Sequence, residues 1–191
     1  VVALITGRFL IRDSQESHTQ QLHLVEGKFK FLQIFTAGYV AFAHGANDVA
    51  NGIGPLAGIW TIYHDGLVGL KSQVPIWILI LGGVGIVLGL AVFGKRVIET
   101  VGTKITAITP SRGFAAEFGA ATIVLVFSKL GMPVSTTHTL VGAVIGVGFA
   151  RGIGAIDLQV VARIFTSWIV TIPASAAVTI GFYYVILYIF V

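Results

Sequence analysis

The residues best suited to chemistry lie in the middle of a long apolar run. Between Phe31 and His64, Asp48 is the only charged side chain, and Asn47 and Asn51 lie within one helical turn of it. A carboxylate in a hydrocarbon environment costs about 2.5 to 3.5 kcal/mol, so it generally marks a functional site. Carboxylate and amide oxygens are hard ligands that suit Na⁺ or another hard cation. The sequence therefore predicts a cation site at Asn47, Asp48 and Asn51.

The same stretch also allows a purely structural interpretation. His44 precedes Asp48 by four residues and shares its face if the helix is continuous. In this alternative the two asparagines only connect neighbouring helices, and Asp48 is either neutral or paired with His44. Three oxygen-bearing side chains within five residues are more than helix contacts require, so we favour the cation site.

A second motif, residues 131–138 with the sequence GMPVSTTH, predicts an anion site. Pro133 ends the element before it, and Ser135 is well placed as the N-cap of a following helix. The first N–H groups of that helix are unpaired and lie at the positive end of its dipole, beside the hydroxyls of Ser135, Thr136 and Thr137. Such a site binds an anion without a basic residue. The alternative is that the hydroxyls only cap the helix and bond to its own carbonyls.

Three further titratable side chains lie in the apolar part of the chain. Glu117 lies on the segment that faces the second motif, and the sequence leaves open whether it binds a coupling ion, carries a proton or accepts structural hydrogen bonds. His44 and His138 are able to titrate near neutral pH. A single histidine in a membrane more often packs and donates a hydrogen bond. We therefore expect coupling or structural roles for all three.

The composition indicates what kind of protein positions these residues. Of 191 residues, 55% are hydrophobic and 10% are charged, with 24 glycines, which is typical of an integral membrane protein with closely packed helices. The net charge of +4 comes from basic residues spread singly between apolar segments, which fits membrane topology better than nucleic-acid binding. The absence of cysteine excludes disulfides, thiolate metal sites and thiol nucleophiles. No nucleotide-binding or catalytic motif is present, so we do not expect an enzyme.

The apolar segments predict an all-α polytopic membrane protein. Residues 31–64 are too long for one straight crossing and contain Gly45, Gly52, Gly54 and Pro55, so we expect a broken or strongly kinked helix. Residues 75–94 predict a single membrane-spanning helix. Residues 113–130 and 133–150 predict a helical hairpin that either crosses the membrane or enters it and returns on the same side. Residues 164–191 predict a final membrane-spanning helix.

The start of the chain and its basic residues predict context and orientation. Residues 1–30 have the pattern of the end of a preceding element followed by a polar loop, and the first residue is not methionine, so we expect a fragment. Basic residues concentrate in the loops 12–30 and 95–112, which the positive-inside rule places in the cytoplasm. The C-terminus is then outside, and a plasma (inner) membrane is expected.

The two motifs together resemble the C-terminal repeat of the inorganic phosphate transporter (PiT) family. The resemblance rests on AHGANDVANGIGPLAGI and GFAAEFGAATIVLVFSKLGMPVSTTHTLVGAVIGVG, in this order, and covers about residues 31–191. It implies one half of a transporter with two inverted repeats that meet through discontinuous or hairpin helices. Each motif occurs once here and twice in the family, so the N-terminal repeat is missing from this sequence.

The resemblance also implies roles for individual residues. Those implied for sodium are Asn47, Asp48 and Asn51, and those implied for phosphate are Ser135, Thr136 and Thr137. Glu117 is associated with transport in the family, and its role stays open.

We therefore predict a secondary active transporter that couples sodium to the symport of inorganic phosphate. Sodium is the coupling ion, and no organic cofactor is expected. The predicted partners are phosphate, sodium, membrane lipid and the missing repeat on the same or a separate chain; a homo-oligomer is compatible, and nucleic acid is not expected. The alternative in the same class is a proton-coupled permease for phosphate, a metal-phosphate complex or sulfate. A more distant alternative is an anion channel or a phosphate-sensing receptor.

Overall fold

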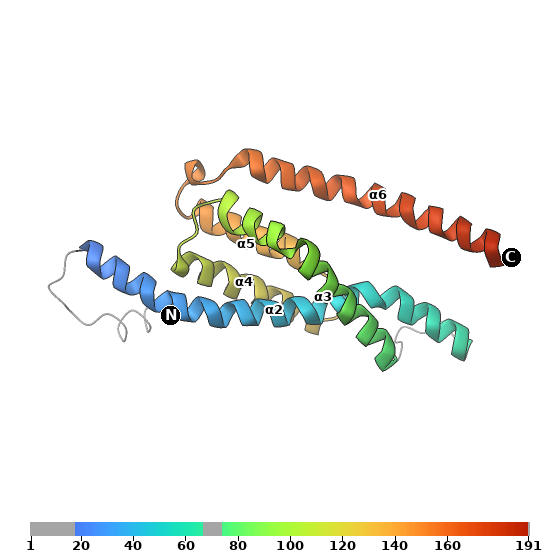
Figure 1. Ribbon diagram of the computed structural model, residues 1–191. Helices are drawn as coiled ribbons and strands as arrows, with labels where there is room; N and C mark the ends of the chain where they lie inside the picture. The colour runs from blue at the N-terminus through green and yellow to red at the C-terminus, as the bar shows by residue number, and fades with distance from the viewer. Residues whose placement is uncertain (1–17, 67–73, 191) are drawn as a thin grey trace.

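The computed structural model describes residues 18–66 and 74–190, which form helices and connecting segments (Figure 1). The elements in chain order are α2 (His18–Asp65), α3 (Ile76–Glu99), the π-helical turn η1 (Thr100–Lys104), α4 (Pro110–Lys129), α5 (Thr136–Phe149), the 3₁₀ turn η2 (Ile153–Ala155) and α6 (Leu158–Phe190). Within these two described ranges, β-structure is limited to an isolated bridge between Thr106 and Ile156. The predicted all-α fold is therefore confirmed.

Helix α2 runs from His18 to Asp65 without interruption, so of the two alternatives predicted for residues 31–64 the break is wrong, and the kink stays a prediction. Pro55 lies inside this helix. A proline removes one backbone hydrogen bond and crowds the carbonyl four residues earlier, here that of Asn51, while the helix on either side keeps its own bonds. The proline therefore removes one donor from the helix and does not divide α2 into two half-helices.

The polar segment that the sequence places in a loop is also helical. Residues 18–30 belong to α2, whereas the predicted preceding element falls largely on residues 1–17, outside the described residues. The helix persists here because it has a packing partner. The rings of Phe29 and Phe114 lie 5.4 Å apart, and Glu26 accepts hydrogen bonds from the backbone N–H and hydroxyl of Ser111 at 2.9 and 2.7 Å. Local polarity does not reveal a partner 85 residues later in the chain.

Helices α2 and α4 lie side by side and run in the same direction, as Figure 1 shows. Polar contacts join them at three levels: Glu26 with Ser111, Thr36 with Glu117, and Asn47 with Ser128. The last two contacts both join residues 81 apart in sequence, so the helices advance in step between them. In this interval Ala43, Ala121 and Val124 form a buried core, in which the small side chains let the helices approach closely.

Helices α4 and α5 form a hairpin with a tight corner. Gly131 has a φ of 73°, and the N–H groups of Gly131 and Met132 bond to the carbonyls of Ser128 and Phe127, which is a helix C-cap that favours glycine. Pro133 then prevents the helix from continuing. The corner lies beside the middle of α2, and α2 continues well beyond it (Figure 1). The hairpin therefore ends partway along the long helix.

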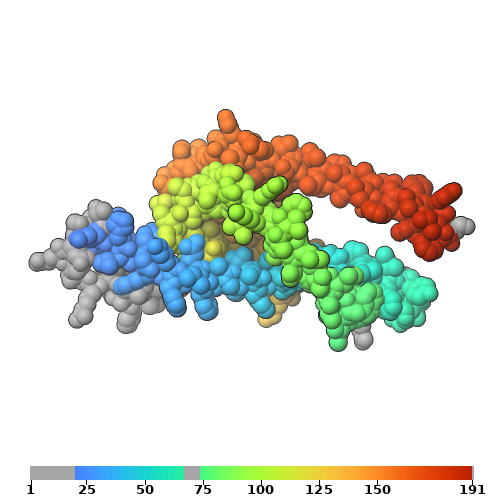
Figure 2. Space-filling view, in the orientation of Figure 1, coloured from blue at the N-terminus to red at the C-terminus, as the bar shows by residue number. Residues whose placement is uncertain are grey.

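Two of the described helices are long and apolar enough to cross a membrane, namely Ile76–Lys104, which joins α3 to η1, and α6. Both are almost wholly exposed in this chain. The N-terminal part of α6 contributes Val160, Val161 and Ile164 to a core cluster around Val141. Its C-terminal half extends past the α4/α5 hairpin (Figure 2), and none of the residues of α6 is buried. Such extended apolar faces are suited to contact with lipid or with further helices.

Candidate functional site

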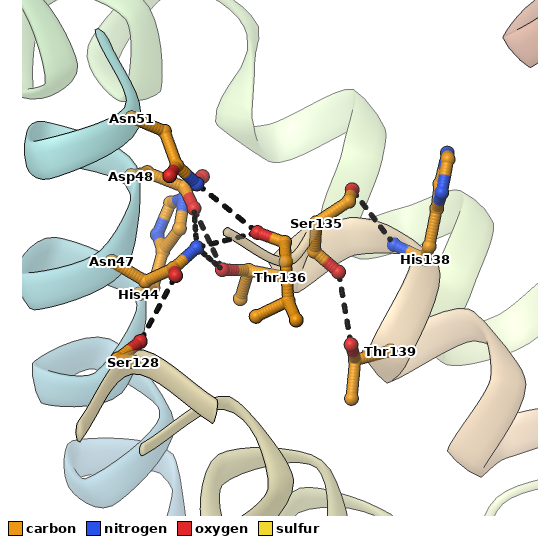
Figure 3. Close-up of polar contacts among 10 residues, drawn as sticks. His44, Asn47, Asp48, Asn51, Ser128, Ser135, Thr136, His138 and Thr139 are labelled. Carbon is orange, nitrogen blue, oxygen red and sulfur yellow. Dashed lines mark hydrogen bonds and ion pairs between the residues drawn. The ribbon is translucent and has the colours of Figure 1, made fainter. Parts of the chain in front are cut away.

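The structure brings the two predicted motifs together in one polar cluster, drawn in Figure 3. Asp48 Oδ1 accepts a hydrogen bond from the Thr136 hydroxyl at 2.7 Å and another from Asn47 Nδ2 at 2.9 Å. Asp48 Oδ2 lies 2.8 Å from Nε2 of His44, one helical turn earlier on α2. Both carboxylate oxygens therefore have a polar partner, and one of the donors comes from the start of α5.

Asn47 and Asn51 hold the segment before α5 against α2. Their side-chain amides donate to the same acceptor, the Val134 carbonyl, at 2.7 and 3.0 Å. Asn47 is only 3% exposed, and its side-chain oxygen accepts a hydrogen bond from Ser128 Oγ at 3.0 Å. Asn51 is exposed, and its side-chain oxygen accepts no hydrogen bond from the part of the chain that the structure describes. Asn47 is thus fully engaged by the protein, whereas Asn51 has an oxygen available to a ligand.

The start of α5 has the N-cap that the sequence predicts. Ser135 is the N-cap residue, and its hydroxyl accepts a hydrogen bond from the backbone N–H of His138 at 3.3 Å. Thr136 is buried and its hydroxyl donates to Asp48. Thr137 is exposed, and within residues 18–66 and 74–190 its hydroxyl has no partner. The three adjacent hydroxyls therefore differ: one caps the helix, one links it to α2 and one is free.

An open pocket of about 410 Å³ adjoins this cluster. It is lined by Asp48, Asn51, Pro133, Val134 and Ser135. One wall carries a carboxylate and an amide oxygen, which suit a hard cation. The other lining residues, Pro133 to Ser135, lead into α5, whose first backbone N–H groups have no partner in the helix and favour an anion. Residues of both predicted motifs therefore line one pocket.

Glu117 lies away from the pocket. Its carboxylate accepts a hydrogen bond from the hydroxyl of Thr36, which is 2% exposed. Along α4, Glu117 lies three helical turns, or about 16 Å, from Ser128, which contacts the cluster. Of the roles that the sequence leaves open for Glu117, the contact fits a structural acceptor between α2 and α4.

His138 also lies outside the cluster. Its ring points away from Asp48 in Figure 3 and packs on Trp168 of α6, with ring centroids 3.8 Å apart. The structure therefore brings His44 to the carboxylate but not His138. The contact with Trp168 is the packing role expected of an isolated membrane histidine.

Two members of the cluster are absent from the sequence-based prediction. Ser128 is a polar residue three positions before Gly131, the glycine of the hairpin corner. This position close to the corner is the sequence signal that could have identified Ser128 as part of the site. The Val134 carbonyl is a backbone group, so its role as an acceptor does not depend on a side chain that the sequence could reveal. It is recognised only when the structure shows that this segment lies against Asn47 and Asn51 of α2.

Comparisons with known proteins agree with the motifs. A family model described as the phosphate transporter family matches residues 2–179. A protein of Pyrococcus horikoshii with the provisional name phosphate permease is 59% identical over 150 residues, which cover 78% of this chain. The sodium-dependent phosphate transporter 2 of Xenopus laevis is 46% identical over 172 residues, or 90% of this chain. These proteins are named as transporters or permeases, not as enzymes.

A solved structure described as the sodium-dependent phosphate transporter shares the fold. It superposes on the whole of this chain with a TM-score of 0.78 and 44% sequence identity. This chain spans only 37% of the Pyrococcus protein, 26% of the Xenopus protein and 46% of the solved chain. The predicted family is therefore confirmed, and so is the prediction of an integral membrane protein. The chain belongs to the phosphate transporter family.

Proposed function

We propose that this chain is one repeat of a sodium-coupled phosphate symporter. The observation that carries the proposal is the hydrogen bond from Thr136 Oγ1 to Asp48 Oδ1, which joins the predicted cation ligand to the predicted phosphate site. Because these residues are 88 positions apart, their 2.7 Å contact is a property of the fold. The names of the Xenopus relative and the solved transporter support sodium and phosphate as the two ions.

The cation ligands in this proposal are oxygens of Asp48 and Asn51. Asp48 and Asn51 both line the pocket, and the backbone carbonyl of Asn51 adds an oxygen because Pro55 cannot donate to it. Asn47, the third residue predicted as a ligand, is engaged by Val134 and Ser128. We therefore assign Asn47 a positioning role.

The phosphate ligands are the backbone N–H groups at the start of α5 and the hydroxyls of Ser135 and Thr137, each of which has a proton that no described group accepts. The N–H groups of Thr136 and Thr137 belong to the first turn of α5 and have no acceptor within the helix. The hydroxyl of Ser135 lines the pocket side of the turn, and that of Thr137 is free to donate. Together they offer donors and a partial positive charge without a buried arginine.

Thr136 accounts for the coupling between the ions. Its hydroxyl has a single proton, which is donated to Asp48. A sodium ion on Asp48 offsets the carboxylate charge and weakens this bond, so the proton becomes available to a phosphate oxygen. Because binding free energies are linked, phosphate must then strengthen sodium binding by the same factor. In this proposal sodium binds first; the linkage itself is symmetric and does not set the order.

The rest of the transport pathway comes from outside this sequence. The chain spans less than half of each relative's length, and we assign the exposed faces of α3 and α6 to lipid and to the second repeat, on the same or a separate chain. Filling of the pocket lets one repeat rock against the other. The first turns of α2 and residues 95–112 lie in the cytoplasm and the C-terminus outside, in a plasma (inner) membrane.

Asp48→Asn tests the proposal because it removes the charge and keeps the shape. Sodium-dependent uptake of labelled phosphate is expected to disappear, while the amount of protein in the membrane fraction stays the same. Asp65→Asn, at the exposed end of α2, is the matched control and leaves uptake unchanged. Normal uptake by Asp48→Asn across a sodium titration would show that the cation is not bound there.

A proton-coupled phosphate permease is the second candidate, because His44 Nε2 lies 2.8 Å from Asp48. A histidine titrates near neutral pH, so this pair is able to carry a proton. Phosphate uptake measured with choline in place of sodium, at two pH values, separates the candidates. Uptake that persists in choline and rises at the lower pH supports protons, whereas uptake that needs sodium at both pH values supports sodium.

A further inference from the structure

We infer that Arg112 and Arg151 form a second anion site, for a phosphate group, at the base of the α4/α5 hairpin. Arg112 lies in the first turn of α4, and Arg151 follows the end of α5. Both guanidinium groups donate from Nη1 to one backbone oxygen, that of Ala107, at 3.2 and 3.4 Å. Two side chains of like charge, 39 positions apart, are thus held beside a single neutral carbonyl.

Neither arginine forms a direct ion pair within the part of the chain that the structure describes. Glu26 is close enough to interact electrostatically with Arg112, and its two oxygens accept hydrogen bonds from the backbone N–H and hydroxyl of Ser111. Asp157 caps the start of α6 by accepting hydrogen bonds from two backbone N–H groups. Glu26 therefore offsets part of the charge of Arg112, and no described carboxylate bonds directly to either guanidinium group.

The start of α4 lies beside this pair. Its first turn contains Arg112 and no acidic residue of its own. A cation is unfavourable at a helix N-terminus unless an anion lies nearby; the Glu26 carboxylate, which bonds to Ser111, supplies one such anion, and a bound phosphate group would add a second. Figure 1 shows the start of α4, the turn η2 and the start of α6 at the same end of the molecule, away from the hairpin corner. This site is therefore distinct from the pocket beside Asp48.

The geometry of the donors favours a phosphate group. Each guanidinium has five N–H groups, so most remain free after the bond to Ala107. Their planar, paired arrangement matches the oxygens of phosphate better than a point charge does. Basic sites between helices at the cytoplasmic surface meet phosphate groups from two sources, anionic lipid headgroups and free inorganic phosphate. The ligand chemistry is the same in both cases, and the experiment separates the sources.

Arginine modification by phenylglyoxal, read by peptide mass spectrometry, tests the site in this chain reconstituted into vesicles. The three arms are phosphatidylcholine with chloride, phosphatidylcholine with inorganic phosphate at equal ionic strength, and phosphatidylcholine mixed with phosphatidylglycerol. At ten times the Kd, the ligand leaves about a tenth of the sites free, so modification of Arg112 and Arg151 is expected to slow about tenfold. Protection in the second arm alone identifies free phosphate, and protection in the third alone identifies lipid.

Internal and variant controls make the result decisive. Arg96 is exposed at the same end of the molecule and is expected to react equally in all arms. Arg112→Gln should remove the protection of Arg151, whereas the matched control Lys95→Gln should not. The inference is overturned if neither arm protects the pair, if Arg96 is protected equally, or if Arg151 stays protected in Arg112→Gln. Thr136→Val should keep the protection, so failure here is distinguishable from failure of the proposed transport site.

Discussion

At the residue scale, the two asparagines beside Asp48 look equivalent in sequence but have different surroundings. Asn47 is buried, and its amide nitrogen lies within hydrogen-bond distance of Val134, Asp48 and Thr136. Asn51 is exposed and shares only the Val134 carbonyl. One side chain therefore holds the site together, and the other faces the pocket.

This difference predicts separate effects of the two alanine variants. Asn47→Ala leaves buried polar groups unpaired and should lower the free energy of unfolding by about 1 to 3 kcal/mol. Asn51→Ala should change stability little and raise the sodium concentration needed for half-maximal phosphate uptake. Thermal unfolding in detergent measures the stability of both variants, and a sodium titration of phosphate uptake measures their sodium dependence. Equal losses of stability in both variants would contradict the assignment.

The sequence identified the charged and capping residues of the site but not their connections. Asp48 was predictable because a lone carboxylate in an apolar run is costly, and Ser135 because a hydroxyl residue after a proline is a typical N-cap. The roles of Ser128 and the Val134 carbonyl were not, because they depend on which faces of α2, α4 and α5 meet. The distinct contacts of three adjacent hydroxyls likewise require the structure.

At the element scale, the hairpin was predicted well and the long helix was not. Gly131 and Pro133, at the corner, are strong local signals that one helix ends and that the next begins only after the proline. The glycines and Pro55 of α2 were weighted too heavily, since one missing hydrogen bond does not divide a helix that packs along its length. The helical start of α2 was missed because its partner, α4, lies far along the chain.

Glu26 provides a prediction at this scale, because it joins α2 to the first turn of α4. Burial raises the pKa of the Glu26 carboxyl, but hydrogen bonds from Ser111, with a smaller effect of Arg112, hold the pKa below its ordinary value. A pKa lowered by folding means that the ionised group stabilises the fold above its ordinary pKa, and that this stability is lost as pH falls through the lowered value.

Glu26→Gln should therefore lower the unfolding temperature at neutral pH, by the equivalent of about 1 kcal/mol for a lost helix cap. The difference from the unmodified chain should shrink as the pH falls below the usual range for glutamate and through the lowered pKa of Glu26. Glu99→Gln is the control, since its pair with Lys104 is exposed and 3.5 Å long and should contribute little. A difference that persists at low pH would show that the carboxylate charge is not responsible.

At the scale of the whole molecule, the chain corresponds to part of its solved relative, and two of its helices have few buried residues. It spans 46% of that relative, and the apolar windows of Ile76–Lys104 and of α6 have 6% and 0% of their residues buried. Composition predicted the membrane and the all-α fold, because hydropathy is a property of segments. The path of α6 was not predictable, because only its N-terminal part packs against the described core.

The central claim is that Thr136 couples the two ions through one proton, and reciprocal binding measures this directly. Phosphate affinity with and without sodium, and sodium affinity with and without phosphate, give two coupling factors that must be equal in the unmodified protein. We predict that Thr136→Ser keeps the factor, within the usual range of about 5 to 150, and that Thr136→Val brings it close to one. An unchanged factor in Thr136→Val would contradict the mechanism.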